Sequence, residues 1–191
     1  MDSAAWDARY AASERVWSVE PNQFVAAHLA SLTPGRALDL AAGEGRNAVW
    51  LSSLGWDVAA VDYSAVAIER GRASGADVTW VVGDVLTCAL PADQDLVLVS
   101  YLQLPATQMR QVWPRAFAAL RPGGTLFVIG HDSSNLTEGV GGPQDPDCLY
   151  VADDVLDALH TDDLLIEEAG RVPRVTEAGT AYDVLVKVRR S

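Results

Sequence analysis

The stretch Arg36–Asp62 constrains the fold more than any other part of the chain. It begins with a short apolar run, Ala37–Leu40, which is followed by a turn that carries Gly43 and Gly45. Apolar residues at helical spacing come next, and then a second apolar run that ends in an acid. A strand, a tight turn, a helix and a second strand in this order predict a βαβ unit. Such a unit requires a parallel sheet with a crossover helix.

The same unit also predicts a ligand. Glycines allow the backbone to come close to a bound molecule, and the helix that follows them points its free N–H groups at that molecule. Asp62 closes the second strand, where a carboxylate can accept hydrogen bonds from both hydroxyls of a ribose. The pattern therefore predicts that a nucleoside-type cofactor binds at the carboxyl ends of the strands.

The turn itself indicates which cofactor this is. A dinucleotide fold uses three glycines spaced G-x-G-x-x-G, the third of which makes room for a pyrophosphate. Gly43 and Gly45 fit the first two places, and Ala48 could fill the third. Glu44, however, lies where a pyrophosphate would bring negative charge, and a dinucleotide site has no need of Asp39. Both carboxylates would suit a ligand that carries an amine and a sulfonium.

The segment Asp39–Gly45, which reads DLAAGEG, resembles the first motif of class I S-adenosylmethionine-dependent methyltransferases, usually D-x-G-x-G-x-G. Ala41 replaces the first glycine of that family and puts a slightly bulkier group near the methionine part of the cofactor. Four further matches follow in the family's order: the ribose-binding acid Asp62, the adenine segment Gly83–Val85, the fourth strand Asp95–Tyr101 and the turn Leu120–Leu126.

Within the family, Gly45-Arg46-Asn47 before an apolar helix, together with Gly55–Val58, looks most like the tellurite-resistance and thiopurine-type small-molecule methyltransferases. The resemblance implies a Rossmann-like α/β fold: a seven-stranded, mostly parallel sheet with an antiparallel last strand and helices on both faces. We expect one domain over residues 1–191, with a helical cap at 1–33 and a loop on the acceptor side at 133–150. The last two strands have no helix between them and should pair in antiparallel fashion.

The resemblance implies S-adenosylmethionine as the cofactor and a binding site made of Asp39, Ala41, Gly43, Glu44, Gly45, Arg46, Asn47, Asp62, Tyr63, Gly83, Asp84, Val85, Ser100, Trp6 and Tyr10. Two of these assignments leave alternatives open. Trp6, Tyr10 and Trp17 either close over the cofactor or only anchor the N-terminal helix. Tyr63 either lies flat on the adenine or has no part in binding.

The methyl group of this cofactor is already a good electrophile, so the protein mainly has to align a nucleophile behind it. A hydroxyl or amine would also need a base, whereas a thiolate or an oxyanion would not. His131 follows the fifth strand and is the candidate base, with Asp132 to orient it or share its role. Tyr101 ends the fourth strand and borders the methyl. A purely structural role for His131 is the alternative.

Composition excludes several other classes of protein. The net charge is −12 and Lys187 is the only lysine, so an extended nucleic-acid partner is not expected. No apolar run reaches the roughly 18 residues of a membrane helix, and residues 1–10 lack a signal-peptide core. Two cysteines, Cys88 and Cys148, are too few and too far apart for a zinc site. We expect a cytoplasmic protein without a metal, and the sequence leaves its oligomeric state open.

These features predict methyl transfer from S-adenosylmethionine to a small-molecule acceptor: a thiol, an oxyanion, a hydroxyl or an amine. Two other classes remain as alternatives. A regulatory module would bind the cofactor without turnover. An NAD-dependent oxidoreductase would bind a dinucleotide, which Asp39, Glu44 and the incomplete glycine pattern oppose.

Overall fold

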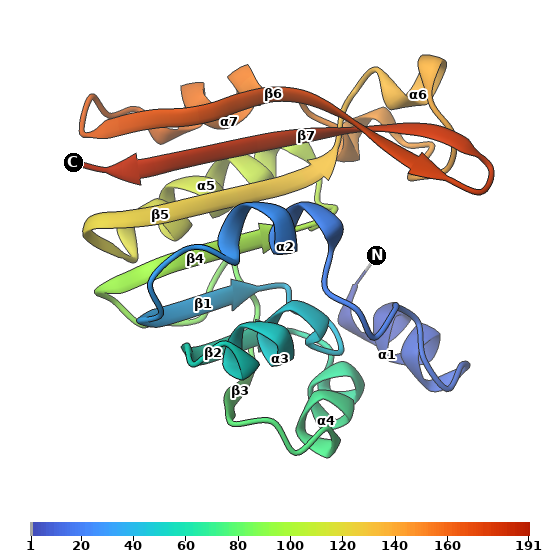
Figure 1. Cartoon of the computed structure of the whole chain (residues 1–191). Helices are drawn as coiled ribbons and strands as arrows, with labels where there is room; N and C mark the ends of the chain where they lie inside the picture. Colours follow the sequence, from blue (N-terminus) through green and yellow to red (C-terminus); the bar gives the residue numbers. More distant parts are fainter. Residues whose placement is uncertain (1) are drawn as a thin grey trace.

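One sheet organises the molecule, and its strands lie in the order β3-β2-β1-β4-β5-β7-β6 (Figure 1). The computed structural model describes residues 2–191. The seven strands are β1 Arg36–Leu40, β2 Asp57–Asp62, β3 Val78–Val82, β4 Gln94–Ser100, β5 Leu120–His131, β6 Leu164–Thr176 and β7 Gly179–Arg190.

Strands β1 to β5 are parallel, and β7 runs antiparallel to both of its neighbours, β5 and β6. The predicted seven-stranded sheet with an antiparallel last strand is therefore confirmed. The α-helices are α1 Ser3–Ala11, α2 Gln23–Leu29, α3 Arg46–Ser53, α4 Ala65–Ala73, α5 Ala106–Ala118, α6 Asn135–Glu138 and α7 Ala152–Leu159.

The two faces of the sheet are buried by different helices. Leu38 and Leu40 of β1 belong to the apolar cluster that includes Met109 and Trp113 of α5, together with residues of α7. Ala37 points to the other face and joins a cluster formed with α2 and α3. This alternation follows from the two-residue period of a strand and fixes the register of β1 between the two layers.

The N-terminal helix α1 lies outside this layered core, beside α4 and near the carboxyl ends of the strands (Figure 1). Asp7 fastens it there: its Oδ1 accepts hydrogen bonds from Ser64 Oγ at 2.5 Å and from Val66 N at 3.2 Å. Because Ser64 is the N-cap of α4, the contact joins the middle of α1 to the N-terminus of α4, 57 residues further along the chain. The expected helical start of the chain is thus present, as a helix that ends at Ala11.

The segment after β5 holds more structure than its glycines and prolines predict. It contains α6 and a 3-10 helix, Pro146–Cys148, and so is not an unstructured loop. Asn135, which is buried, accepts a hydrogen bond from Tyr182 N at 2.7 Å and donates one to the carbonyl of Gly141 at 2.9 Å. Elements of three and four residues are too short to produce a periodic pattern, so the sequence does not reveal them.

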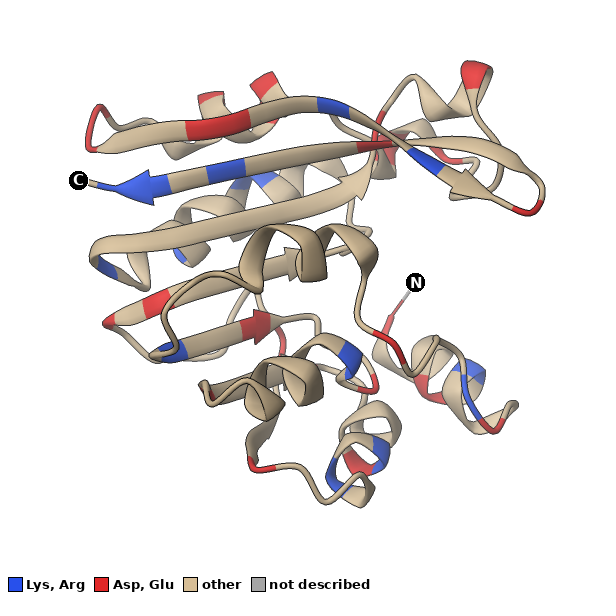
Figure 2. Ribbon diagram, viewed as in Figure 1, with Lys and Arg blue, Asp and Glu red and all other residues tan. Residues whose placement is uncertain are grey.

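Charged residues of both signs are interspersed over the elements (Figure 2). Among residues 2–191, no helix has both the length and the apolar character needed to cross a bilayer.

Candidate functional site

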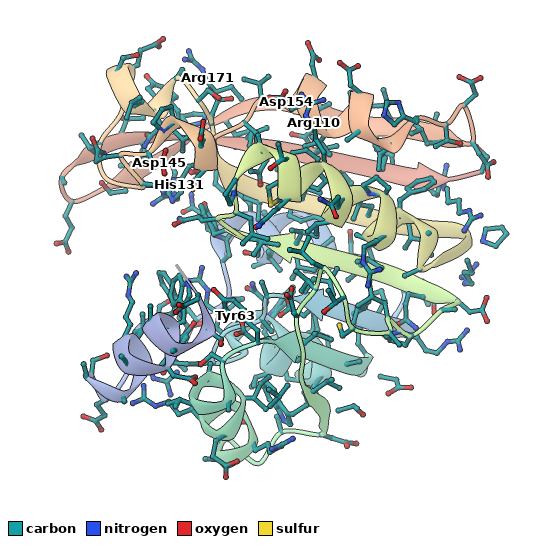
Figure 3. All side chains as sticks on the ribbon, turned by 180° about the vertical axis from the view of Figure 1, so that it is seen from behind. Tyr63, Arg110, His131, Asp145, Asp154 and Arg171 are labelled. Atoms are coloured by element: carbon teal, nitrogen blue, oxygen red, sulfur yellow. The ribbon has the colours of Figure 1, made fainter. Side chains whose placement is uncertain are left out.

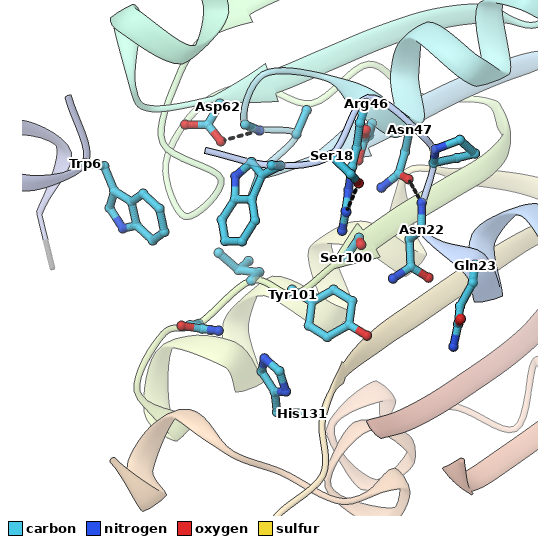
Figure 4. A pocket seen from close by; sticks show the side chains of 18 of the residues that line it. Trp6, Ser18, Asn22, Gln23, Arg46, Asn47, Asp62, Ser100, Tyr101 and His131 are labelled. Carbon is cyan, nitrogen blue, oxygen red and sulfur yellow. Dashed lines mark hydrogen bonds between the residues drawn. The ribbon is translucent and has the colours of Figure 1, made fainter. Parts of the chain in front are cut away.

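A cavity of about 530 Å³ lies at the carboxyl ends of the parallel strands (Figure 4). It is lined by residues that follow β1, β2, β4 and β5, by the segment before α2, and by the end of β6. Strands β1 and β4 are neighbours in the sheet but lead to opposite sides of it, and open α/β sheets place their ligands at such a switch point.

Most of the sequence-predicted site residues line this cavity. From the predicted cofactor set these are Trp6, Tyr10, Asp39, Ala41, Gly43, Arg46, Asn47, Asp62, Tyr63 and Ser100, and from the predicted catalytic set they are Tyr101 and His131. Figure 3 shows Tyr63 and His131 on the two opposite halves of this end of the molecule. The remaining six do not belong to the lining: Glu44, Gly45, Gly83, Asp84, Val85 and Asp132.

The turn after β1 uses its two glycines for different purposes. Gly43 has a φ of 57°, and a Cβ there would lie 2.7 Å from the hydroxyl of Tyr10, on the cavity side. Gly45 has a φ of 81°, and a Cβ there would run into the ring of Trp80 on β3. Only Gly43 therefore allows the backbone to approach a ligand. Ala41 also adopts a left-handed φ of 56°, a conformation that costs a non-glycine residue about 1–2 kcal/mol.

Asp39 is the least satisfied polar group of the site. It is only 1% exposed and lines the cavity. Neither of its carboxylate oxygens makes a hydrogen bond of good geometry among residues 2–191. Burial and the nearby charge of Asp62 raise the pKa of Asp39 to about 7. The charge of Arg46 and the backbone amide of Ala48 act to lower that pKa. A buried carboxylate without a partner is costly, and a cation or donor in the cavity would relieve that cost.

Asp62, at the end of β2, holds the glycine turn in place. Its Oδ2 accepts a hydrogen bond from Gly43 N at 2.8 Å, and its Oδ1 accepts one from Ser64 N at 2.8 Å (Figure 4). Burial raises the pKa of Asp62, and these two hydrogen bonds oppose the rise. Tyr63 follows directly and lines the cavity, and burial beside Asp62 raises its pKa to about 12, so its hydroxyl stays protonated near neutral pH.

Three aromatic side chains from the N-terminal segment cover this part of the cavity. Trp17 Nε1 donates a hydrogen bond to the hydroxyl of Tyr10 at 3.0 Å. The ring of Trp6 lies 5.7 Å from that of Tyr10 and 6.4 Å from that of Trp17. All three line the cavity, and Tyr10 is almost fully buried. The cluster both anchors α1 and stands over the glycine turn, so the two alternatives from the sequence are compatible.

Glu44 contacts the N-terminal segment and not the cavity. Its Oε2 accepts hydrogen bonds from Val16 N at 3.0 Å and from Trp17 N at 3.2 Å. Its Oε1 forms an ion pair with Arg70 at 2.9 Å, and Arg70 in turn donates to the carbonyl of Ser13. Glu44, which we predicted to bind the cofactor, therefore holds in place the N-terminal segment that covers this part of the cavity.

The next two residues of the motif also hold this segment. Arg46 Nη1 donates a hydrogen bond to Ser18 Oγ at 3.0 Å, and Asn47 Oδ1 accepts one from Asn22 N at 2.9 Å (Figure 4). Arg46 and Asn47 also line the cavity. The start of α3 therefore contacts both the cavity and the N-terminal segment that covers it.

The predicted adenine segment after β3 shapes a turn outside the cavity lining. Asp84 Oδ1 accepts a hydrogen bond from Leu86 N at 2.9 Å, and its carbonyl accepts from the amides of Thr87 and Cys88. Val85 is buried in the cluster beneath α5. A Cβ at Gly83 would lie 3.1 Å from Cys88 Cβ, which makes its small size a packing requirement.

Behind the lining of the opposite half lies a carboxylate that sequence reasoning missed. Asp183 of β7 is fully buried, and its Oδ2 accepts hydrogen bonds from the Tyr101 hydroxyl and from Arg174 Nε, both at 2.6 Å. Its Oδ1 lies 3.4 Å from His131 Nδ1. Burial by itself would raise the pKa of Asp183, but the contact with His131 and the hydrogen bonds from Arg174 and Tyr101 outweigh it and lower the pKa.

Asp132 has a different environment from the one we predicted. Its Oδ1 accepts hydrogen bonds from Ser134 N at 2.9 Å and from Ser134 Oγ at 2.6 Å, so it stabilises the turn before α6. The carboxylate beside His131 is Asp183. The only sequence signal for it is an acid inside the apolar run Ala181–Val188, because a buried acid needs a partner or a function.

Residues 37–124 match the family model described as a methyltransferase domain. This segment contains the glycine turn, Asp39 and Asp62, and it runs through β1 to β4 of the sheet described above. This part of the chain is therefore similar to a methyltransferase domain.

Solved structures show the same fold over more of the chain. The chain matches a protein studied for the conversion of a disulfide bond into a thioacetal group during echinomycin biosynthesis: TM-score 0.79, 22% identity, 99% of this chain and 91% of the other. It matches N-methyltransferase NodS from Bradyrhizobium japonicum, in complex with S-adenosyl-L-homocysteine: TM-score 0.74, 19% identity, 100% and 99% coverage. TehB from Haemophilus influenzae gives TM-score 0.74 and 17% identity over 90% of this chain and 63% of TehB.

One curated relative is similar in sequence. Hemagglutinin 1 of Eikenella corrodens is 30% identical over 105 residues, which cover 52% of this chain and 35% of that protein. The chain thus spans about a third of the length of this relative. The predicted Rossmann-like fold is confirmed, and the match of residues 37–124 to a methyltransferase domain agrees with the predicted family.

Proposed function

We propose that the protein transfers the methyl group of S-adenosylmethionine to a small-molecule acceptor held in the 530 Å³ cavity. The observation that carries this proposal is Asp39: a buried carboxylate at the cavity that makes no hydrogen bond of good geometry within residues 2–191. The cationic amine of the cofactor's methionine part would supply a partner. A pyrophosphate would instead place a negative charge against it.

The other lining residues fit the remaining parts of the cofactor. Asp62 would accept hydrogen bonds from the ribose hydroxyls while it keeps its bonds to Gly43 and Ser64. Gly43 leaves room for the ligand to approach the backbone, and Trp6 and Tyr10 would exclude water from above. The cofactor supplies an electrophilic methyl group, and the residues of the chain bind it, orient it and shield it.

The acceptor would lie on the other half of the cavity, beside Tyr101, Leu104 and His131. The cavity volume is in the range of small-molecule sites, about 300–1,000 Å³. This supports a small acceptor, as does the net charge of −12, which disfavours an extended nucleic-acid partner. A cytoplasmic location stays a prediction from the sequence.

Calorimetry tests the first part of this proposal. We expect S-adenosylmethionine and S-adenosylhomocysteine to bind at one site and NAD not to bind. Asp39→Asn should weaken the binding of both compounds that carry the amine. Binding of NAD in preference to S-adenosylmethionine would overturn the proposal and favour an oxidoreductase.

Turnover tests the second part. The protein should form S-adenosylhomocysteine when it is incubated with S-adenosylmethionine and at least one compound from a panel of thiols, phenols, amines, selenite and tellurite, followed by mass spectrometry. Tight cofactor binding without product from any member of the panel would instead favour a regulatory module.

A further inference from the structure

Asp183 joins four elements at the floor of the acceptor half. It sits on β7 and binds Tyr101 after β4, Arg174 on β6 and His131 at the end of β5. Oδ2 takes the two short hydrogen bonds, from Tyr101 and Arg174. Oδ1 faces His131 and makes only a longer contact, 3.3 Å, with Arg174 Nη2. One carboxylate oxygen is therefore left for the histidine.

This arrangement determines which ring nitrogen of neutral His131 carries the proton and which one carries the lone pair. Nδ1 is buried and lies 3.4 Å from Asp183 Oδ1, without a hydrogen bond of good geometry to any of residues 2–191. A Cβ at Gly142 would lie 3.0 Å from Nδ1, so the loop backs this side of the ring. A carboxylate beside Nδ1 favours the neutral form that carries its proton there. The lone pair is then on Nε2, and because His131 lines the cavity, Nε2 is the nitrogen available to an acceptor.

Tyr101 is placed to support this ring and not to act as the base itself. Its ring contacts His131 edge-on, with 4.9 Å between the ring centroids (Figure 4). Its hydroxyl donates a hydrogen bond to Asp183. Burial together with the charge of Asp183 raises the pKa of Tyr101. Tyr101 also has a left-handed φ of 52°, which is strained for an aromatic residue, and such strain is typical of functional sites.

We propose that Asp183 positions His131 as a general base, and that the methyl acceptor is therefore a protic nucleophile: a hydroxyl, a thiol or an amine that carries an N–H. Asp183 acts through the histidine and is a positioning residue. This inference rests on the proposed methyl transfer and names its acceptor class.

The charges of the cavity favour such an acceptor over a chalcogen oxyanion. Two arginines line the cavity, and both are engaged: Arg174 by Asp183, and Arg46 by Ser18 and by its proximity to Asp39. An oxyanion would face the lone pair of His131 Nε2, which is unfavourable. Arg174 would not offset this, because its charge is already balanced by Asp183. A protic group meets the same lone pair as a hydrogen-bond donor.

One proton and one methyl group move in the reaction step. His131 Nε2 takes the proton of the acceptor, and the lone pair of the acceptor atom forms the new bond to the methyl carbon. The bond between that carbon and the sulfonium sulfur breaks, and its electron pair stays on sulfur as S-adenosylhomocysteine is formed. The imidazolium, paired with Asp183, then releases its proton to water.

The tautomer of His131 can be measured without any acceptor. In long-range ¹H–¹⁵N spectra of the wild-type protein with neutral histidine, we expect the proton on Nδ1. We expect Asp183→Asn to change this assignment and Glu138→Gln to leave it unchanged, because Glu138 of α6 pairs with Arg171 of β6 at the exposed surface, outside the cavity lining. A proton on Nε2 in the wild-type protein would overturn the inference.

Turnover tests the acceptor class with named probes: an aromatic thiol, a phenol, an aromatic amine, selenite and tellurite. His131→Ala should lower kcat on a protic acceptor by about a hundredfold or more. Exogenous imidazole should restore part of it, while the dissociation constant of S-adenosylmethionine stays within about twofold. Methylation of selenite or tellurite alone would overturn the acceptor class and leave the proposed function standing. Failure to bind S-adenosylmethionine would instead remove the proposed function.

Discussion

The two halves of the cavity are built in different ways. The cofactor half comes mainly from one short segment, Asp39–Asn47, with Asp62 beside it. The acceptor half comes from Tyr101, His131, Arg174 and Asp183, which are spread over more than eighty residues and four elements. The first half depends on local backbone conformation, and the second depends on the register between β5, β6 and β7. A local motif can therefore predict only the first half.

The largest expected effect tests the local half. Gly43→Val should abolish binding of S-adenosylmethionine in a folded protein, because a branched side chain would meet the hydroxyl of Tyr10 and is disfavoured at a φ of 57°. Gly75→Val is the matched control: Gly75 has a φ of 73°, but a Cβ there meets nothing within 4 Å. Calorimetry with circular dichroism distinguishes them. Native structure with undiminished binding in Gly43→Val would reduce the turn to a plain connector.

Asp62→Ala should weaken cofactor binding by about 1.5–3 kcal/mol, the value of hydrogen bonds to a charged group. Part of this loss is indirect, because Asp62 also holds the amide of Gly43. Asp62→Asn keeps an acceptor for that amide and should lose less. The dissociation constants of the two variants therefore separate contact with the ligand from support of the turn. Equal, wild-type affinity in both would remove Asp62 from the cofactor site.

Asp39 makes the cofactor half sensitive to pH. Its pKa is raised, to about 7, so the native state keeps its proton where the unfolded chain has lost it. The stabilisation that this gives the protein without ligand is fully present below the ordinary pKa of an aspartate. It is lost as the pH rises through about 7.

Cofactor binding should show the opposite trend, because an ammonium group needs the ionised carboxylate. Below pH 7 the affinity for S-adenosylmethionine should fall as the pH is lowered, with a limit of about tenfold per pH unit. Calorimetry in buffers of different ionisation enthalpy would detect the released proton. Asp39→Asn should bind weakly at pH 8 and show a flatter profile between pH 5 and 7. An unchanged slope in that variant would assign the titration to another group, such as Asp62.

The family resemblance of the sequence predicted a seven-stranded, mostly parallel sheet, and the missing helix between the last two strands predicted their antiparallel pairing. The sequence placed Asp39, Gly43 and Asp62 at the cavity because each sits where a parallel strand ends. It did not find Asp183 or Arg174, whose roles depend on the pairing of β6 with β7. Nor could it show that Glu44 bonds to amides 27 and 28 residues earlier in the chain.

The smallest expected effect tests whether the cover of the cofactor half depends on that contact. Glu44→Gln removes the charge that pairs with Arg70 and weakens the hydrogen bonds from Val16 and Trp17. We expect affinity for S-adenosylmethionine to fall by about 1 kcal/mol, and faster amide exchange at residues 13–17. Glu69→Gln is the control, since its pair with Arg72 on the neighbouring helix is exposed. Faster exchange without loss of affinity would show that the aromatic cluster anchors α1 and does not cover the ligand. Unchanged exchange would show that Trp6, Tyr10 and Trp17 hold the segment in place without Glu44.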